Sequence, residues 1–189
     1  FAGGYDQNQD ELNYTTSVYT ADTVGNSIYI VDAKTGSLIW SASNRSGHTL
    51  KLDKMQYSIP SNIRVIDIQE ANGELVSDDE KLADQFFVGD TGGQVWRFFI
   101  NNGNSAANLV TAGSNGGVLA SLGNASTAEH ARKFFSAPDV AVLDVDGQRS
   151  LSINIGSGYR SHPLNKTIRD RFYSLRTSAV FADDSQSVL

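Results

Sequence analysis

The residues of this sequence that could carry chemistry are few and scattered. Asp144-Val145-Asp146-Gly147 has the form with which a calcium-binding loop begins, because alternating carboxylates followed by a glycine can wrap a hard cation. The next residues, Gln148 to Leu151, add no further carboxylate. Asp-Gly between two apolar runs is instead a strong signal for a tight β-hairpin turn. We therefore predict a turn at Asp146-Gly147.

Other candidate motifs also favour structural roles. Gly89-Asp90-Thr91-Gly92-Gly93 resembles a phosphate-binding loop, but such a loop precedes a helix, and here a strand pattern follows. Arg160 and His162 follow a Gly-Ser-Gly turn and could form a polar site, although a hydrogen-bonding role within the structure is the simpler interpretation. The three histidines, His48, His130 and His162, share no metal-ligand spacing, and there is no G-x-S-x-G motif. We therefore identify no catalytic residues.

Composition narrows the class of protein further. With no cysteine, disulfides, Cys-ligated zinc and thiol catalysis are excluded. The net charge of -6 argues against a nucleic-acid-binding surface. No apolar run approaches the roughly 20 residues needed to span a bilayer, so we expect no membrane insertion in this segment. Because the chain begins at Phe1 and carries no signal peptide, we expect a processed product or a piece of a longer protein.

Most of the secondary structure that the sequence predicts, and that must position these candidate residues, is β-strand. Residues 27–32 and 37–40 are two β-rich runs joined by a turn at 33–36, which predicts a hairpin. The same pattern returns in residues 85–98, and a glycine stands four residues before a tryptophan in both hairpins, at Gly36 and Trp40 and again at Gly92 and Trp96. Because the tryptophans occupy matching positions, we expect both to pack between sheets.

A second repeated motif, in which glycines precede a tyrosine, occurs at Gly3-Gly4-Tyr5-Asp6 and at Gly156-Ser157-Gly158-Tyr159. The chain therefore divides into about three all-β units, for which we predict the approximate boundaries 1–54, 55–125 and 126–189. Such repeats are typical of the four-stranded antiparallel blades of a β-propeller, which closes with about 4 to 8 blades. Three blades cannot close a ring, so the remainder must lie outside this chain unless the chain dimerises or leaves sheet edges exposed. We further expect a long surface loop or a weakly structured excursion over residues 101–124, and one or two helical turns within 127–134.

With these segments in view, the chain resembles the C-terminal β-propeller domain of the PilC/PilY family of type IV pilus proteins. The similar segments are FAGGYD (1–6), GNSIYIVDAKTGSLIW (25–40), MQYSIPSNIRVIDIQ (55–69), DQFFVGDTGGQVWRF (84–98), RKFFSAPDVAVL (132–143), SINIGSGYRSHPL (152–164) and DRFYSLR (170–176). VGDTGGQVWR and GSGYRSHPL are long enough to be specific. The resemblance implies a quinoprotein-like propeller, seven-bladed when complete, of which this chain supplies about three blades.

The resemblance also implies a function. It indicates a non-enzymatic protein of pilus assembly, twitching motility and adhesion, exported through the periplasm to the bacterial cell surface, at the pilus tip or outer membrane. The implied partners are pilins or minor pilins, other pilus components, and a host-cell or abiotic surface, with no nucleic acid.

A regulatory calcium ion is the cofactor that the resemblance implies. In this family the ion occupies a compact acidic loop, which corresponds here to residues 67–84. Matching that loop places candidate ligands at Asp67, Gln69, Asn72, Asp78 and Asp84, but an insertion that carries Asp78, Asp79 and Glu80 breaks the register. Three outcomes are open: the insertion supplies the missing carboxylate, the site binds calcium weakly, or the segment is an acidic excursion without metal.

An enzyme is the alternative function. The repeated G-x-x-x-W hairpins also resemble those of pyrroloquinoline quinone dehydrogenases, which are propellers that use calcium and a quinone. Those enzymes need an axial cavity in a closed ring, and many carry a vicinal cysteine pair. A purely structural propeller that has lost calcium is the third possibility. The sequence favours the pilus-associated module.

Overall fold

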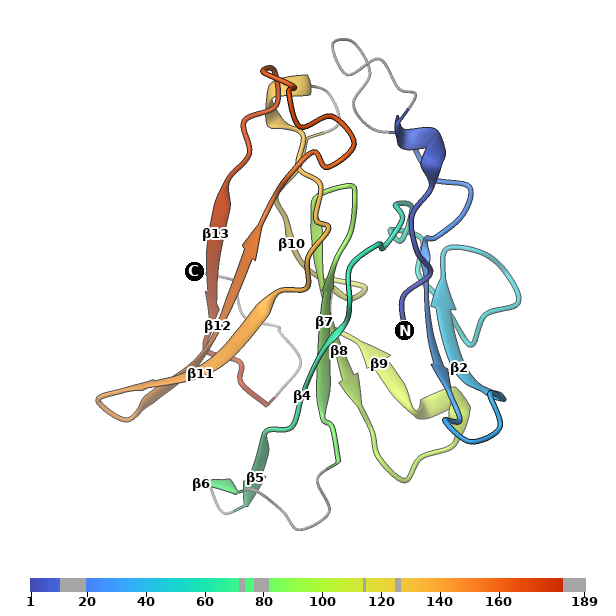
Figure 1. The fold of residues 1–189 in the computed structure, drawn as a ribbon. Coiled ribbons are helices and arrows are strands. Elements are labelled where there is room, and N and C mark those ends of the chain that lie inside the picture. The colour runs from blue at the N-terminus through green and yellow to red at the C-terminus, as the bar shows by residue number, and fades with distance from the viewer. Residues whose placement is uncertain (11–19, 72–73, 77–81, 114, 125–126, 182–189) are drawn as a thin grey trace.

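A computed structural model describes residues 1–10, 20–71, 74–76, 82–113, 115–124 and 127–181 (Figure 1). These residues form an all-β fold with three short 3₁₀-helices and no α-helix. No helix among the described residues is long and apolar enough to cross a membrane. The strands are β1 (Ser27–Val31), β2 (Leu38–Ser43), β3 (Leu50–Lys51), β4 (Arg64–Ile66), β5 (Gln69–Ala71), β6 (Glu74–Val76), β7 (Gln85–Gly89), β8 (Gln94–Ile100), β9 (Val110–Ala112), β10 (Val118–Ser121), β11 (Asp139–Val145), β12 (Gln148–Gly156) and β13 (Phe172–Thr177).

The first sheet has the order β1-β2-β3 and contains the predicted hairpin at residues 27–40. The turn forms because the Asp32 carboxylate accepts backbone N–H bonds from Lys34 at 2.9 Å and Thr35 at 2.7 Å. Gly36 then adopts a φ of 74°, which a side chain would disfavour. Strand β3 pairs with β2 in parallel, and an isolated bridge from Ala2 to β1 places the N-terminal segment at the other edge.

The second sheet has the order β4-β7-β8-β10, with β9 also paired to β8. It contains the second predicted hairpin, β7-β8, in which Val88 pairs with Trp96. The prediction that residues 101–124 form a long surface loop is wrong, because this stretch contains β9 and β10. Both strands are short and lie among glycines and asparagines, which obscure the alternation of apolar and polar residues typical of a strand. They form because they pair with successive parts of the free edge of β8.

The third sheet has the order β11-β12-β13. Strands β11 and β12 pair from Val145↔Gln148 onward, so their loop is the two residues Asp146 and Gly147. These two residues have φ angles of 54° and 76°, which is the signature of the tight hairpin turn that the sequence predicts there. Only one short helical turn, η3 (Ala128–His130), forms within residues 127–134.

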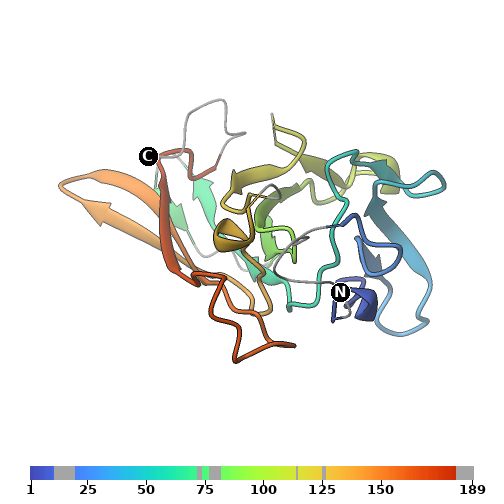
Figure 2. The same cartoon turned by 90° about the horizontal axis from the view of Figure 1, so that it is seen from above.

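The three sheets stand side by side as β-propeller blades, with the second between the other two (Figures 1 and 2). They span residues 27–51, 64–121 and 139–177. The second sheet is four strands wide, its outermost position being shared by β9 and β10, whereas the first and third each contain three named strands among the described residues.

Both faces of the β7-β8 hairpin are buried, which explains the continuous apolar run of β7. Phe86 and Val88 pack toward the first sheet, and Phe87 packs toward the third. The prediction that Trp40 and Trp96 are packing residues is confirmed. Both are fully buried in the core between the first two sheets, and Trp40 meets Phe86 and Phe98 edge-on, with ring centroids 6.4 Å apart in each case.

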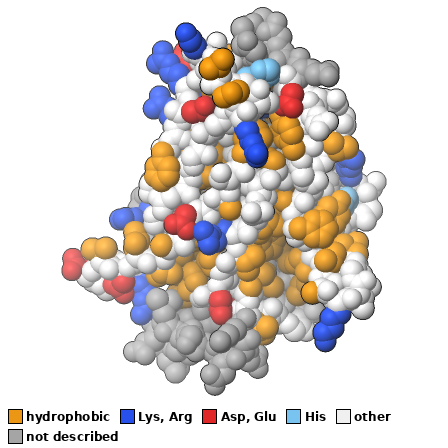
Figure 3. All heavy atoms as spheres, in the orientation of Figure 1, with side chains coloured by type: hydrophobic (Ala, Val, Ile, Leu, Met, Phe, Trp, Pro, Cys, Tyr) orange, Lys and Arg blue, Asp and Glu red, His pale blue; other side chains and the backbone are white. Residues whose placement is uncertain are grey.

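Some apolar surface remains on the outside of the molecule. On the face shown in Figure 3, hydrophobic side chains are visible near the N-terminal segment and over the middle of the molecule. Phe1 is 66% exposed and stacks on Tyr29 with ring centroids 5.3 Å apart.

Candidate functional site

Two of the five predicted calcium ligands, Asp67 and Asp84, lie at the mouth of the 67–84 excursion. Strands β4 and β7 pair up to Ile66↔Gln85, so these aspartates occupy the next position on each strand. Asp84 is held in place because its N–H donates to the Ile66 carbonyl at 3.0 Å and its carboxylate accepts the Ile68 N–H at 2.5 Å. Asp67 is exposed.

Of the three remaining predicted ligands, only Gln69 lies among the described residues. Gln69 begins strand β5 and pairs with Val76 of β6, while Asn72 and Asp78 lie outside the described residues. Calcium takes about 6–8 oxygen ligands, and the described residues of the excursion do not complete such a site. The described residues contain no group of three or more His, Cys, Asp or Glu side chains that could hold a metal ion.

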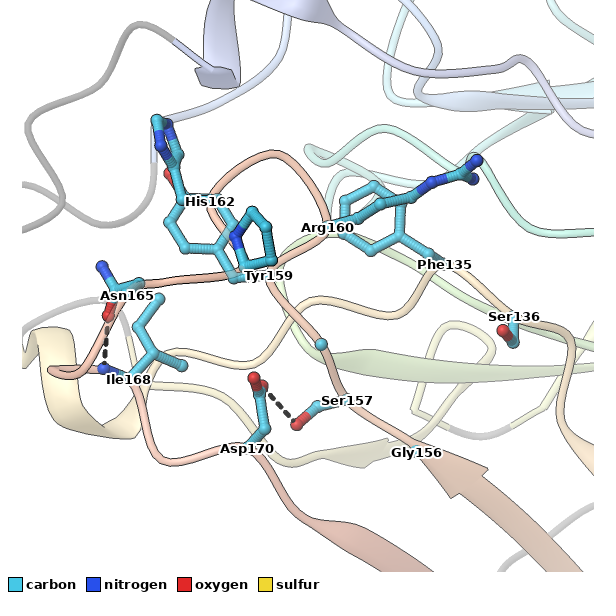
Figure 4. Close-up of a pocket in the computed structure, with 12 residues that line it drawn as sticks. Phe135, Ser136, Gly156, Ser157, Tyr159, Arg160, His162, Asn165, Ile168 and Asp170 are labelled. Atoms are coloured by element: carbon cyan, nitrogen blue, oxygen red, sulfur yellow. Dashed lines mark hydrogen bonds between the residues drawn. The ribbon is translucent and has the colours of Figure 1, made fainter.

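A different site lies at the end of the molecule where loops from all three units converge. The segment between β12 and β13 folds back over residues 135–136 and lines a cavity of about 370 Å³ (Figure 4). A second cavity of about 310 Å³ shares two of its wall residues, Phe135 and Arg160. Together they form what we call the loop-end pocket.

Local hydrogen bonds shape the first cavity of the loop-end pocket. The Ser157 hydroxyl donates to Asp170 Oδ1 at 2.9 Å and accepts the Arg171 N–H at 2.9 Å, which ties the two ends of the 157–171 loop together. At the far end of this loop, Asn165 Oδ1 accepts the N–H groups of Thr167 and Ile168. This fixes the amide so that its NH₂ group points away from the backbone donors, and that nitrogen has no hydrogen-bond partner among the described atoms.

Arg160 and His162, flagged in the sequence as a polar pair, both line the first cavity but differ in role. His162 Nε2 lies 2.8 Å from the Asp10 carbonyl, and its ring meets Tyr159 with centroids 4.9 Å apart. His162 therefore has the structural role that was the simpler interpretation. Arg160 is exposed and makes no hydrogen bond or ion pair with any described residue.

The second cavity brings the N-terminal segment to the site. The Tyr5 hydroxyl donates to Asp10, and the Tyr5 ring lies 5.4 Å from the Phe135 ring. Burial raises the pKa of Tyr5 above its ordinary value, so this hydroxyl stays protonated. The two echoing glycine-tyrosine motifs, around Tyr5 and Tyr159, thus lie on neighbouring walls of one pocket.

Buried charges lie beneath the pocket. The Lys133 ammonium stands 5.3 Å above the Tyr159 ring centre, and desolvation lowers the pKa of Lys133 to about 8, although nearby aspartates oppose this change. The Lys133 carbonyl accepts the Gly158 N–H at 3.0 Å, which anchors the Gly-Ser-Gly turn. Through these contacts, Gly158 and Tyr159, which form the floor of the pocket, are anchored to the buried core.

Asp90 joins the second and third units behind this floor. Its carboxylate accepts the N–H groups of Gly92 and Gln94 at 2.9 Å and the indole N–H of Trp96 at 2.8 Å. Its carbonyl accepts the Phe134 N–H at 3.0 Å. Complete burial raises the pKa of Asp90 to about 7 despite these donors. The Gly89–Gly93 loop is therefore a structural junction, as its turn-like pattern predicts.

Comparison with known proteins supports the fold. No protein-family model matches the chain, and no curated protein matches it. Among solved structures, the chain is similar to the C-terminal domain of PilY1 from Pseudomonas aeruginosa, with a TM-score of 0.50 and 17% sequence identity. The similarity covers 85% of this chain and 33% of the PilY1 chain, so this chain spans about a third of that domain. At this identity the likeness concerns the fold, which is all-β with sheets arranged as propeller blades.

Proposed function

We propose that this chain is a non-enzymatic propeller segment of a type IV pilus biogenesis and surface-adhesion protein of the PilC/PilY kind. The observation that carries the proposal is the structural similarity to the PilY1 C-terminal domain over 85% of the chain. The two most specific similar segments also sit at organising positions. VGDTGGQVWR forms the central hairpin with its Asp90 junction, and GSGYRSHPL forms a wall of the loop-end pocket.

The proposed partners follow from this role. The chain would be exported through the periplasm and act at the cell surface, at the pilus tip or outer membrane. There it would contact pilins or minor pilins and a host-cell or abiotic surface. Its net charge of -6 favours protein or surface partners over nucleic acid.

Purified components test the pilus role directly. The chain is immobilised, and soluble domains of the minor pilins from the same bacterium are passed over it, with an unrelated β-propeller as control. We expect saturable binding to at least one minor pilin, and loss of surface pili when residues 1–189 are deleted from the gene. Absence of binding to every pilin, together with normal piliation after the deletion, would refute the proposal.

Calcium is a separate part of the proposal. Asp67 and Asp84 would be the carboxylates at the mouth of the excursion, since they directly adjoin Ile66 and Gln85, the last pair of the β4-β7 ladder. Isothermal titration with millimolar calcium compares wild type with Asp67→Asn and Asp84→Asn. The control is Asp144→Asn, which removes a carboxylate from the remote β11-β12 turn. We expect a heat of calcium binding from the wild type and from the Asp144→Asn control, and none from Asp67→Asn or Asp84→Asn. If wild type gives no heat and no rise in melting temperature, the calcium proposal fails.

The enzyme alternative has a simple test of its own. Incubation with pyrroloquinoline quinone, calcium and alcohols, followed with a dye acceptor, should give no turnover. Turnover would overturn the proposal that the segment has no chemistry of its own.

A further inference from the structure

The loop-end pocket has the size and walls of a small-molecule site, and this inference does not depend on the pilus role. Its two cavities, about 370 and 310 Å³, fall within the range of about 300–1,000 Å³ typical of ligand pockets. It lies where loops of the three units meet, so its walls come from segments far apart in sequence (Figures 1 and 4). Loops held by a rigid scaffold are common places for binding residues.

The charges around the pocket limit the kind of ligand. Arg160 contributes one exposed positive charge, while Asp170 and Asp10 contribute negative charge to the first and second cavities. An anionic ligand would meet the two carboxylates, and a cationic ligand would meet the guanidinium. The mixture favours a neutral ligand that both donates and accepts hydrogen bonds.

The hydrogen-bonding groups match a ligand rich in hydroxyls. The exposed Arg160 guanidinium supplies donors. Asp170 uses Oδ1 to accept the Ser157 hydroxyl, and its Oδ2 has no partner among the described residues. A hydroxyl can accept from Arg160 and donate to Asp170, and neighbouring hydroxyls on one ring can do both.

An aromatic wall completes the pattern. Phe135 is half-buried and borders both cavities, and Tyr5 packs against it with a ring-centroid distance of 5.4 Å. Tyr5 holds the Phe135 ring in place, which lowers the entropy cost of using it as a contact surface. The C–H face of a sugar ring packs well on such an aromatic face, whereas a linear polyol has no equivalent flat apolar face.

We propose that the loop-end pocket binds a neutral saccharide, with Phe135 as the stacking face and with Arg160 and Asp170 as partners of the sugar hydroxyls. Because the pocket is open, the site suits the end or a branch of a surface glycan. Binding would then be weak for a single sugar and would be strengthened by several copies on one surface.

Saturation-transfer NMR on the purified chain tests the proposal. The probes are methyl α-D-mannoside, methyl β-D-galactoside, methyl α-D-glucoside and N-acetylglucosamine, with methyl glucuronide and glucosamine as the charged counterparts. We expect saturation transfer from at least one neutral probe, a dissociation constant in the millimolar range, and weaker transfer from both charged probes. Transfer from no neutral probe, or stronger binding of a charged probe, would overturn the assignment.

Matched variants locate the binding. Phe135→Ala and Asp170→Asn should each weaken binding at least tenfold, while Asp144→Asn, on the distant hairpin, should leave it unchanged. Because Phe135→Ala also removes a contact of Tyr5, its melting curve is measured in parallel, and Asp170→Asn tests the site without a change of volume. Undiminished binding by a folded Asp170→Asn variant would place the sugar elsewhere and refute the proposal. Pilin binding is measured separately, so loss of either proposal leaves the other standing.

Discussion

Replacing Trp96 with phenylalanine should destabilise this chain far more than the same replacement at Trp40. Both indoles are fully buried in the same core between the first and second sheets, so the two substitutions remove the same volume from similar surroundings. They differ in the indole N–H. That of Trp96 donates to the Asp90 carboxylate at 2.8 Å, whereas that of Trp40 has no partner among the described atoms.

The expected difference can be worked out from these contacts. Shrinking a buried indole to a phenyl ring costs about 1–2 kcal/mol through lost burial and the cavity left behind. Loss of a hydrogen bond to a charged group adds about 1.5–3 kcal/mol at Trp96. At Trp40 the removed N–H was unpaired, so relief of its desolvation offsets much of the cavity cost. Trp96→Phe should therefore cost about 3–5 kcal/mol and Trp40→Phe about 0–1 kcal/mol.

Thermal and urea denaturation followed by far-ultraviolet circular dichroism measures this difference without relying on tryptophan fluorescence. The measurement is made at pH 8, because the pKa of Asp90 is about 7 and its carboxylate must be ionised. With about 2–4 °C per kcal/mol for a chain of this size, the two melting temperatures should differ by about 5–15 °C. Equal destabilisation, or a greater loss for Trp40→Phe, would refute the assigned role of the Trp96–Asp90 bond.

Three further predictions concern the same central region. Stability should fall as the pH rises from about 4 to 7, because burial raises the pKa of Asp90 from 3.8 to about 7 and the folded state keeps a proton that the unfolded chain has released. Urea midpoints should show this slope, and Asp90→Asn should flatten it. Gly92→Ala should cost about 1–3 kcal/mol, because its Cβ would lie 2.0 Å from the Tyr57 ring, while Gly158→Ala, with nothing within 4 Å, should be near neutral in the same melts. Arg97→Met should speed hydrogen exchange in residues 178–181, because Arg97 donates to carbonyls of residues 179 and 180 at 2.7 and 3.0 Å; unchanged exchange would mean that these bonds do not hold the segment.

The parts of the fold that could be predicted are those encoded within about fifteen consecutive residues. The hairpins at residues 27–40 and 85–98 follow from β-branched and aromatic runs on either side of a turn. The Asp146-Gly147 turn follows from two residues that tolerate positive φ. Strands β9 and β10 could not be predicted, because they are strands through pairing with β8 and not through their own composition.

The loop-end pocket was predictable only in part. Arg160 and His162 stood out because they follow a glycine-rich turn, and both line the first cavity. Phe135, Asn165 and Asp170 carry no motif that marks them as site residues. The echo between the motifs around Tyr5 and Tyr159 was the one available signal, since the fold brings both motifs to this pocket.

The sequence by itself determined the class of this protein: all-β repeats, hairpins with matched tryptophans, and no residue set suited to thiol or Cys-ligated zinc chemistry. These features depend on local backbone preferences and composition, which act on neighbouring residues. Only the tertiary structure decided that Asp90 joins the second and third units, and that Trp96 but not Trp40 has a hydrogen-bond partner among the described atoms. It also decided that Arg160 and Asp170 border one cavity with Phe135. Each of these is a contact between side chains whose distance depends on how whole sheets pack, and no short stretch of sequence specifies that packing.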